Sequence, residues 1–155
     1  MLHILFVCHG NICRSTMAES VLSDMIDKRG LTEKIAVSSA ATHTDEIGSP
    51  PHVGTQRKLR QMNIPVVPHR ARLLTRADGA KYDFIIGMDE ANLRNMRRIL
   101  GEEHFPKISL LLDYTASPRA IADPWYTGNF DETFNDITEG LEGFLQFLNE
   151  QGLLD

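Results

Sequence analysis

Hydrophobic and polar positions near the start of the chain predict a buried strand followed by a helix. The segment Leu2–Val7 is apolar and rich in Phe, Ile and Val, and it stops at a polar stretch that begins with Cys8. A buried strand shows this pattern where it reaches a loop. Helical spacing follows, in an apolar stripe that Gly30 is placed to end. The stripe consists of Met17, Val21, Leu22, Met25 and Ile26.

The rest of the chain alternates between strand-like and helix-like segments. Further strands are predicted at 34–39, 82–88 and 107–112. Further helices are predicted at 51–62, between a capping Asp89 and Gly101, and near the C-terminus. One face of the last helix consists of Phe134, Ile137, Leu141, Phe144, Leu145 and Leu148. The irregular stretches 40–51 and 113–129 are predicted to be long loops of the kind found at working sites.

Alternating strands and helices favour a parallel sheet covered by helices on both faces. We therefore expect one α/β domain over residues 1–155, a three-layer α/β/α arrangement of the Rossmann-like kind. Ligands of such sheets bind beyond the carboxyl ends of the strands. The first candidate site is thus the loop Cys8-His9-Gly10-Asn11-Ile12-Cys13-Arg14-Ser15.

Composition and charge exclude several classes of partner. The chain has 155 residues, 42% of them apolar, and a formal net charge of −5 with its basic residues scattered, which argues against nucleic acid or anionic lipid as the main partner. No membrane-spanning run and no basic leader are present, so we expect a cytoplasmic, soluble protein. The two cysteines, Cys8 and Cys13, exclude a disulfide framework.

The first loop is suited to hold a phosphate group. A Cys, five residues and an Arg between a strand and a helix N-terminus can curl around a tetrahedral anion with backbone N–H groups pointing inward. Gly10 and Asn11 tolerate the positive φ angles that such a curl needs, and Arg14 can donate two hydrogen bonds to two phosphate oxygens. The inward-pointing N–H groups, the helix N-terminus and Arg14 also favour the thiolate form of Cys8 over the thiol. The thiolate is then a nucleophile. The simpler interpretation is a buried Cys at a strand end and a solvated Arg.

The loop also resembles that of a known family. Its sequence Val-Cys-His-Gly-Asn-Ile-Cys-Arg-Ser and the later Asp-Pro-Trp-Tyr are similar to the low-molecular-weight protein tyrosine phosphatases. Further matching motifs are Met17-Ala18-Glu19, Ser39-Ala40-Ala41-Thr42, His69-Arg70-Ala71-Arg72 and Met88-Asp89-Glu90. The resemblance implies a four-stranded parallel sheet and hydrolysis of phosphotyrosine or small aryl phosphates through a phosphocysteine, with no cofactor and no metal.

The resemblance also assigns a general acid. Cleavage of a phosphate ester needs a proton for the leaving oxygen, and by resemblance Asp123 donates it and later activates water. Pro124 favours an extended conformation of Asp123, and Trp125 or Tyr126 would flank an aromatic ring above the pocket. An ordinary Asp-Pro turn is the simpler interpretation of the dipeptide.

Several other residues match supporting positions of the family. By resemblance, Asn11, Ser15, Ser39 and His69 hold the loop in shape, and we expect Ser15 to stabilise the thiolate. The family usually has Pro where this chain has Thr16, and we predict that Thr16 and Glu19 form a capping box instead. Cys13 is either a packing residue or, as the resemblance implies, a redox partner that forms a disulfide with Cys8.

The rim of the pocket differs from that of the family. His9 replaces a commonly apolar residue and Asp45 replaces one that is often aromatic, so peptide preference cannot be copied from relatives. Two alternatives to the phosphatase remain. An arsenate reductase on this scaffold would need a downstream cysteine pair, which the chain lacks, and a non-catalytic phosphate-binding module would need neither a nucleophile nor an acid. Phosphate and vanadate are expected inhibitors, and the protein is expected to be a monomer or to self-associate weakly.

Overall fold

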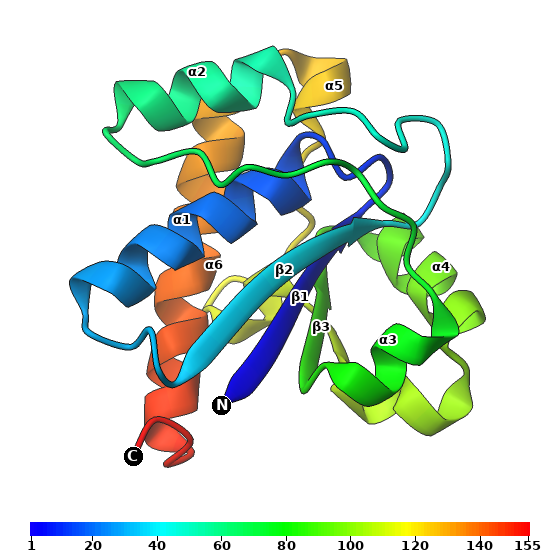
Figure 1. The fold of residues 1–155 in the computed structure, drawn as a ribbon, viewed down its shortest axis with the longest axis vertical. Coiled ribbons are helices and arrows are strands. Elements are labelled where there is room, and N and C mark those ends of the chain that lie inside the picture. The colour runs from blue at the N-terminus through cyan, green and yellow to red at the C-terminus, as the bar shows by residue number, and fades with distance from the viewer.

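The computed structural model describes residues 1–155 and contains one four-stranded parallel sheet in the order β2-β1-β3-β4 (Figure 1). The sequence-based prediction of a parallel α/β fold is therefore confirmed. Both neighbours of β1 pair with it in parallel register, so that Phe6 lies beside Ser39 and Ile86. The strands are β1 (Leu2–Cys8), β2 (Ile35–Ala41), β3 (Phe84–Gly87) and β4 (Ile108–Leu110).

The central strand β1 is apolar from Ile4 to Cys8 because both of its faces are covered there. Side chains alternate between the two faces of a strand. Ile4 and Phe6 belong to the larger apolar core on one face, whereas Leu5 and Val7 belong to a smaller core on the other. All four are completely inaccessible to solvent, which gives the molecule three layers.

Helices cover each face of the sheet as Figure 1 shows. The longer helices α1 and α6 pack together with α2 over the larger core, while α3 and α4 pack against the smaller one. The helices are α1 (Arg14–Lys28), α2 (Val53–Gln61), α3 (Arg76–Lys81), α4 (Glu90–Leu100), α5 (Pro124–Thr127) and α6 (Phe130–Glu150). Two 3₁₀ turns, η1 (Glu102–Lys107) and η2 (Leu111–Tyr114), flank β4. None of the helices combines the length and the apolarity needed to span a lipid bilayer.

The predicted ends of α1 and α4 are confirmed. Gly30 lies just beyond α1 with a φ of 68°, and Gly101 ends α4 with a φ of 89°. At the start of α4 the carboxylate of Asp89 accepts a hydrogen bond from the Asn92 backbone at 2.8 Å. These positions follow from local chemistry, since only glycine adopts positive φ without strain and a carboxylate satisfies free helical N–H groups.

The prediction of a strand over 107–112 is wrong at its end. The strand stops at Leu110, because the carboxylate of Asp113 accepts a hydrogen bond from the Leu110 backbone at 2.9 Å and turns the chain into η2. The short helices α3 and α5 lie in stretches for which we predicted no helix. Helices of six and four residues show too little apolar periodicity to be recognised.

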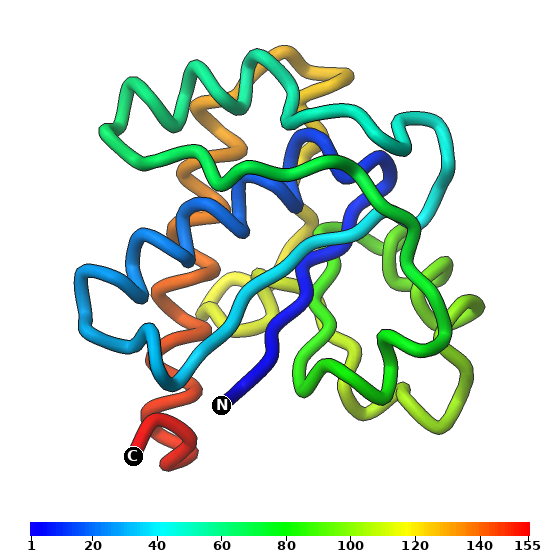
Figure 2. The backbone as a smooth tube through the Cα atoms, in the orientation of Figure 1, coloured from blue at the N-terminus to red at the C-terminus, as the bar shows by residue number.

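The loops at the carboxyl ends of the strands come together at one end of the sheet. The loop after β1 lies against the loop after β2, since the Thr42 backbone donates to the Cys8 carbonyl at 3.0 Å. The segment between α2 and α3 crosses the same end, where Leu73 forms an isolated parallel bridge with Ala41. The backbone tube in Figure 2 follows this crossing.

Candidate active site

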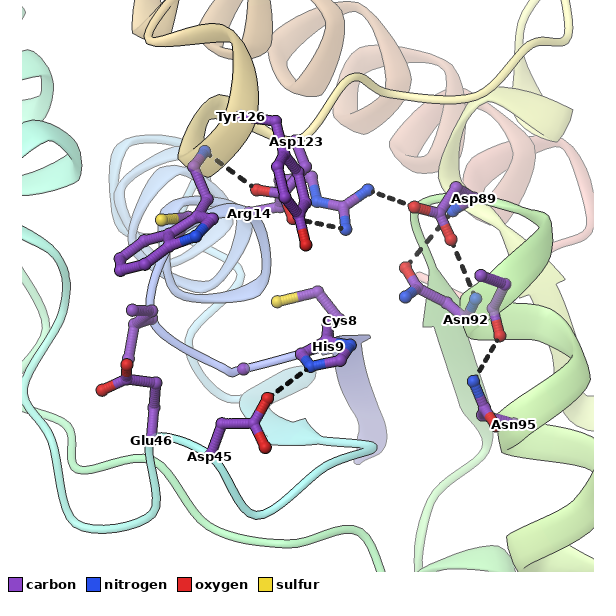
Figure 3. A pocket seen from close by; sticks show the side chains of 15 residues that line it. Cys8, His9, Arg14, Asp45, Glu46, Asp89, Asn92, Asn95, Asp123 and Tyr126 are labelled. Carbon is purple, nitrogen blue, oxygen red and sulfur yellow. Dashed lines mark hydrogen bonds and ion pairs between the residues drawn. The ribbon is translucent and has the colours of Figure 1, made fainter.

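A cavity of about 450 Å³ opens at this end of the sheet (Figure 3). Its lining comes from four separate parts of the chain. They are the loop after β1, the loop after β2, the start of α4, and the segment around α5. The fifteen lining residues are Cys8, His9, Gly10, Ile12, Cys13, Arg14, Asp45, Glu46, Asp89, Ala91, Asn92, Asn95, Asp123, Trp125 and Tyr126.

Cys8 is the last residue of β1 and lies in the floor of the cavity. Its side chain is almost fully buried, and its Sγ atom lies 3.1 Å from the Ser15 hydroxyl. Ser15 can donate its O–H to a thiolate at this distance, as expected from the sequence. Since Ser15 is the second residue of α1, the helix start itself holds the hydroxyl beside the sulfur.

Arg14 is held across the cavity by two carboxylates from other loops. One terminal nitrogen donates to Asp89 at 2.7 Å and to the Ile121 carbonyl at 2.9 Å, and the other faces Asp123 at 3.4 Å. Burial opposes the positive charge, but the negative charge of Cys8 and the two carboxylates raise the pKa of Arg14 above its ordinary value. The guanidinium therefore stays charged, and its Nε atom is buried without a hydrogen-bond partner.

The sequence analysis identified Asp89 as a helix cap and missed its contact with Arg14. One oxygen of Asp89 caps α4 and the other binds the guanidinium. The available signal was its position directly after β3, because carboxyl ends of parallel strands meet at one edge of the sheet.

Asp123 has the extended backbone that we predicted for a residue before Pro124, with φ −82° and ψ 115°. Its Oδ1 atom accepts a hydrogen bond from the Trp125 backbone at 3.0 Å, which leaves Oδ2 facing Arg14. Trp125 and Tyr126 follow it on α5 with 56% and 83% of their surface exposed. Both line the cavity and lie at its mouth.

A buried hydrogen-bond network holds the loop from behind. Asn11 adopts a φ of 59°, and its amide donates to Ser15 at 2.8 Å and to Ser39 at 2.9 Å. The amide oxygen of Asn11 lies 2.6 Å from Nε2 of His69. Since an amide oxygen only accepts, His69 donates from Nε2. Of the two loop residues expected to tolerate a positive φ, Asn11 adopts it and Gly10 does not.

The predicted capping box between Thr16 and Glu19 is also wrong. The helix begins after Cys13 with no side-chain cap, and the Thr16 hydroxyl donates backwards to the carbonyls of Ile12 and Cys13 at 2.8 and 3.1 Å. Glu19 instead accepts a hydrogen bond from Ser39 at 2.5 Å. Its carboxylate thus extends the network behind the loop, and burial raises its pKa.

His9 and Asp45 form one wall of the cavity. The Nε2 atom of His9 lies 2.8 Å from the Asp45 carboxylate, and its ring stacks on His43 with a centroid separation of 3.9 Å. Glu46, which the sequence analysis did not single out, lies beside them. Its only sequence signal was its place in the long loop after β2.

Cys13 lines the cavity as a second free cysteine. Burial, together with the charge of Cys8, raises the pKa of Cys13 to about 12, so it is a thiol at neutral pH. No group of three or more His, Cys, Asp or Glu side chains is placed to hold a metal ion.

Comparisons with known proteins agree with this geometry. The family model for low molecular weight phosphotyrosine protein phosphatase matches residues 3–153. Among curated relatives, the low molecular weight protein-tyrosine-phosphatase YfkJ of Bacillus subtilis is 40% identical over 97% of this chain and 98% of its own. The human low molecular weight phosphotyrosine protein phosphatase is 36% identical, with 92% and 93% covered.

Solved structures show the same likeness. The crystal structure of Bacillus subtilis YfkJ matches with a TM-score of 0.94 and 41% identity, covering 97% of this chain and 96% of that chain. The crystal structure of DARP, described as the Drosophila arginine phosphatase, matches with a TM-score of 0.84 and 32% identity, covering 93% and 96%. The chain therefore belongs to the low molecular weight phosphotyrosine protein phosphatase family and is a protein-tyrosine phosphatase.

Proposed function

We propose that the cavity hydrolyses phosphotyrosine and small aryl phosphates through a phosphocysteine, with Cys8 as nucleophile, Arg14 as phosphate ligand and Asp123 as general acid and base. The observation that carries the proposal is the convergence on one cavity of Cys8 and Arg14, from the loop after β1, with Asp123, which follows Arg14 by 109 positions. A binding module would need the guanidinium but neither the sulfur nor the second carboxylate.

The first chemical step transfers the phosphoryl group to sulfur. The Cys8 thiolate attacks phosphorus, so that the P–S bond forms while the bond to the phenolic oxygen breaks. Protonated Asp123 gives its proton to that oxygen, which leaves as a phenol. The Ser15 hydroxyl, 3.1 Å from the sulfur, supports the negative charge of the thiolate.

The second step regenerates the enzyme. Asp123, now a carboxylate, removes a proton from water while the water oxygen attacks phosphorus and the P–S bond breaks. The products are inorganic phosphate and the Cys8 thiolate, and Asp123 is protonated again. In both steps Arg14 donates hydrogen bonds to the phosphoryl oxygens. These bonds stabilise the negative charge on the oxygens in the transition state.

Turnover with an aryl phosphate in the presence of a chelator tests the proposal. The wild-type protein should be active, Cys8→Ser inactive, and Arg14→Ala strongly impaired, because these changes remove the nucleophile and the charge partner. Vanadate and inorganic phosphate should inhibit competitively. Substantial activity in Cys8→Ser would overturn the phosphocysteine mechanism.

The same assay separates the alternative functions. An arsenate reductase would consume a thiol reductant with arsenate, yet no cysteine follows Cys13 to complete its cycle. Because one structural neighbour is described as an arginine phosphatase, phosphoarginine belongs beside phosphotyrosine among the substrates tested. We expect the tyrosine ester to be preferred.

The proposal also covers the cellular location, oligomeric state, partners and redox behaviour of the enzyme. We place it in the cytoplasm as a monomer or weakly self-associating protein that acts on phosphotyrosine proteins without cofactor or metal, and without nucleic acid or membrane as partner. A redox role is supported by Cys8 and Cys13, which line one cavity as free thiols. Peroxide would convert the Cys8 thiolate to a sulfenic acid, which condenses with the Cys13 thiol to a disulfide and water.

A further inference from the structure

The rim of the cavity carries two carboxylates that no lysine or arginine neutralises. Of the four carboxylates in the lining, Asp89 and Asp123 face Arg14. Asp45 and Glu46, both on the loop after β2, form no ion pair with a lysine or arginine. Figure 3 shows these two side chains on the opposite side of the Cys8 thiol from Asp123 and Tyr126.

Asp45 is held at the rim by His9, and its carboxylate remains accessible to a substrate cation. One of its oxygens contacts His9 at 2.8 Å, and the side chain remains 65% exposed. The ring of His9 stacks on His43 with an interplanar angle of 8°, and the His43 backbone donates to the His9 carbonyl at 3.1 Å, so the loops that carry His9 and Asp45 are joined. The hydrogen bond with His9 lowers the pKa of Asp45, so the carboxylate is charged at neutral pH.

Glu46 lies next to Asp45 and over the phosphate loop. A Cβ atom added to Gly10 would lie 3.6 Å from Cγ of Glu46, which places the glutamate methylenes above that glycine. The Ser49 hydroxyl donates to one carboxylate oxygen at 3.1 Å. Two arginines of neighbouring segments have other partners, since Arg70 donates to the Gly48 carbonyl at 3.0 Å and Arg98 donates to the Asn95 side chain at 3.2 Å.

A peptide whose phosphotyrosine enters the cavity passes beside Asp45 and Glu46 at its rim. The buried, unpartnered Nε atom of Arg14 is a donor that an anion in the cavity can satisfy. With the phosphate there, the residues on either side of the phosphotyrosine lie across the mouth, between exposed Trp125 and the carboxylates of Asp45 and Glu46.

We propose that Asp45 and Glu46 make this enzyme selective for phosphotyrosine with lysine or arginine beside it in the substrate. The inference rests on the proposed function of the cavity and names its substrate class. A cationic side chain next to the phosphotyrosine meets two carboxylates that lack a cation, whereas a carboxylate there is repelled. Exposed ion pairs are individually weak, so the preference is a matter of degree and depends on salt.

Matched peptides test this selectivity. Three phosphotyrosine peptides differ only at the two flanking positions, which hold Lys, Gln or Glu. At low ionic strength kcat/KM should fall in the order Lys, Gln, Glu, with roughly tenfold between the extremes, as expected for two exposed charge contacts. The difference should lie in KM and shrink at high salt.

The variant Asp45→Asn/Glu46→Gln should reduce the Lys-to-Glu ratio to about twofold or less. The ratio is taken within each variant, so a general loss of activity cancels. The matched control is Glu102→Gln, which removes an exposed carboxylate on η1 that does not line the cavity; it should keep the wild-type ratio. If the wild-type protein hydrolyses an aryl phosphate but has equal kcat/KM for all three peptides, the proposed selectivity is wrong while the proposed function stands. An unchanged ratio in the double variant also overturns the selectivity, whereas absence of aryl phosphate turnover overturns the proposed function.

Discussion

Arg14 shows how one side chain depends on residues far away in the sequence. It lies at the start of α1, but its partners Asp89 and Asp123 follow it by 75 and 109 positions. The short, charge-assisted bond to Asp89 is the stronger contact by distance, and such bonds fix orientation as well as charge. Asp89 therefore sets the direction in which the guanidinium presents its remaining donors.

A first prediction concerns Asp89→Asn. Asparagine caps a helix as well as aspartate does, so α4 should stay intact while the charged partner of Arg14 is lost. We expect kcat/KM for an aryl phosphate to fall roughly ten- to a hundredfold, the usual effect of losing a hydrogen bond to a charged group. Steady-state kinetics and thermal melting measure the two effects separately. Asp24→Asn, which removes a carboxylate paired with Lys28 outside the cavity, is the control, and equal losses in both variants would contradict the positioning role.

A second prediction concerns Asp123→Ala. Phenyl phosphate cleavage should slow by roughly 10²–10⁴-fold, the usual contribution of a general acid, while inhibition by inorganic phosphate changes little. Proton donation matters in the transition state and hardly in the ground state. The loss should shrink for dinitrophenyl phosphate, whose leaving group scarcely needs a proton. Equal losses for leaving groups of different pKa would show that Asp123 is not the acid.

A third prediction concerns Cys13→Ser. After mild peroxide treatment, a dithiol should restore wild-type activity but not that of the variant, because no second thiol captures the sulfenic acid of Cys8. Basal turnover should largely survive the substitution. Since the pKa of Cys13 is raised to about 12, disulfide formation should speed up as pH rises. Intact-mass analysis that finds only added oxygen in oxidised wild-type protein would make Cys13 a packing residue.

At the scale of elements, the long helices and strands could be predicted because each has one dominant local signal. The apolar stripe of α6 and the apolar run Ile4–Val7 of β1 can both be recognised without tertiary information. The end of β4 could not be predicted in this way, since it depends on the Asp113 side chain binding the Leu110 backbone. Likewise, Thr16 does not form a capping box, because α1 begins at Arg14 and Thr16 lies inside its first turn, where its hydroxyl donates to carbonyls of the preceding loop.

A fourth prediction concerns the contact between α6 and η2. Alanine normally stabilises a helix interior by about 1 kcal/mol relative to glycine. At Gly143, however, a Cβ atom would lie 2.2 Å from the backbone carbonyl oxygen of Tyr114, and backbone moves only with its whole element. We therefore expect Gly143→Ala to lower the free energy of unfolding by roughly 1–3 kcal/mol, the usual range for overpacking. Urea denaturation measures this, and Asn149→Ala on the exposed face of the same helix should be neutral or slightly stabilising.

At the scale of the whole molecule, the order and direction of the strands bring the residues of the site together. The sequence alone indicated the loop from Cys8 to Ser15 because strand, glycine, asparagine and helix are contiguous there. Glu46 and the Arg14 contact of Asp89 carry no local signature, because only the parallel sheet brings the loops after β1, β2 and β3 to one end. The network behind the loop joins it to α1, β2 and the segment between α2 and α3, so the stability of the fold and the shape of the site depend on shared groups.

A fifth prediction follows for the pH dependence of stability. Burial, and then the charge of Arg72, lowers the pKa of His69, whereas in the unfolded chain it titrates near its ordinary value of about 6.5. Between these values the unfolded state binds more protons, so His69 contributes stability above pH 6.5 that is lost as the pH falls through its folded pKa. Glu19 acts in the opposite sense, because its raised pKa makes the folded state bind more protons than the unfolded one.

Comparing variants tests the contribution of His69 to this pH dependence. In His69→Gln the amide nitrogen can still donate to Asn11, but nothing titrates at that position. Urea denaturation at pH 7.5 and 5.5 should therefore show a smaller loss of stability for His69→Gln than for the wild type. Adding His43→Gln should reduce the loss further, since burial and the neighbouring His9 lower the pKa of His43 as well. Both variants keep Glu19, whose carboxylate lies 3.7 Å from Nδ1 of His69, so the difference between variants includes any change in the titration of Glu19 that follows from losing the imidazole. If wild type and His69→Gln lose equal stability between the two pH values, then the imidazole is protonated equally in the folded and unfolded states, and its burial behind the phosphate loop has no effect on its titration.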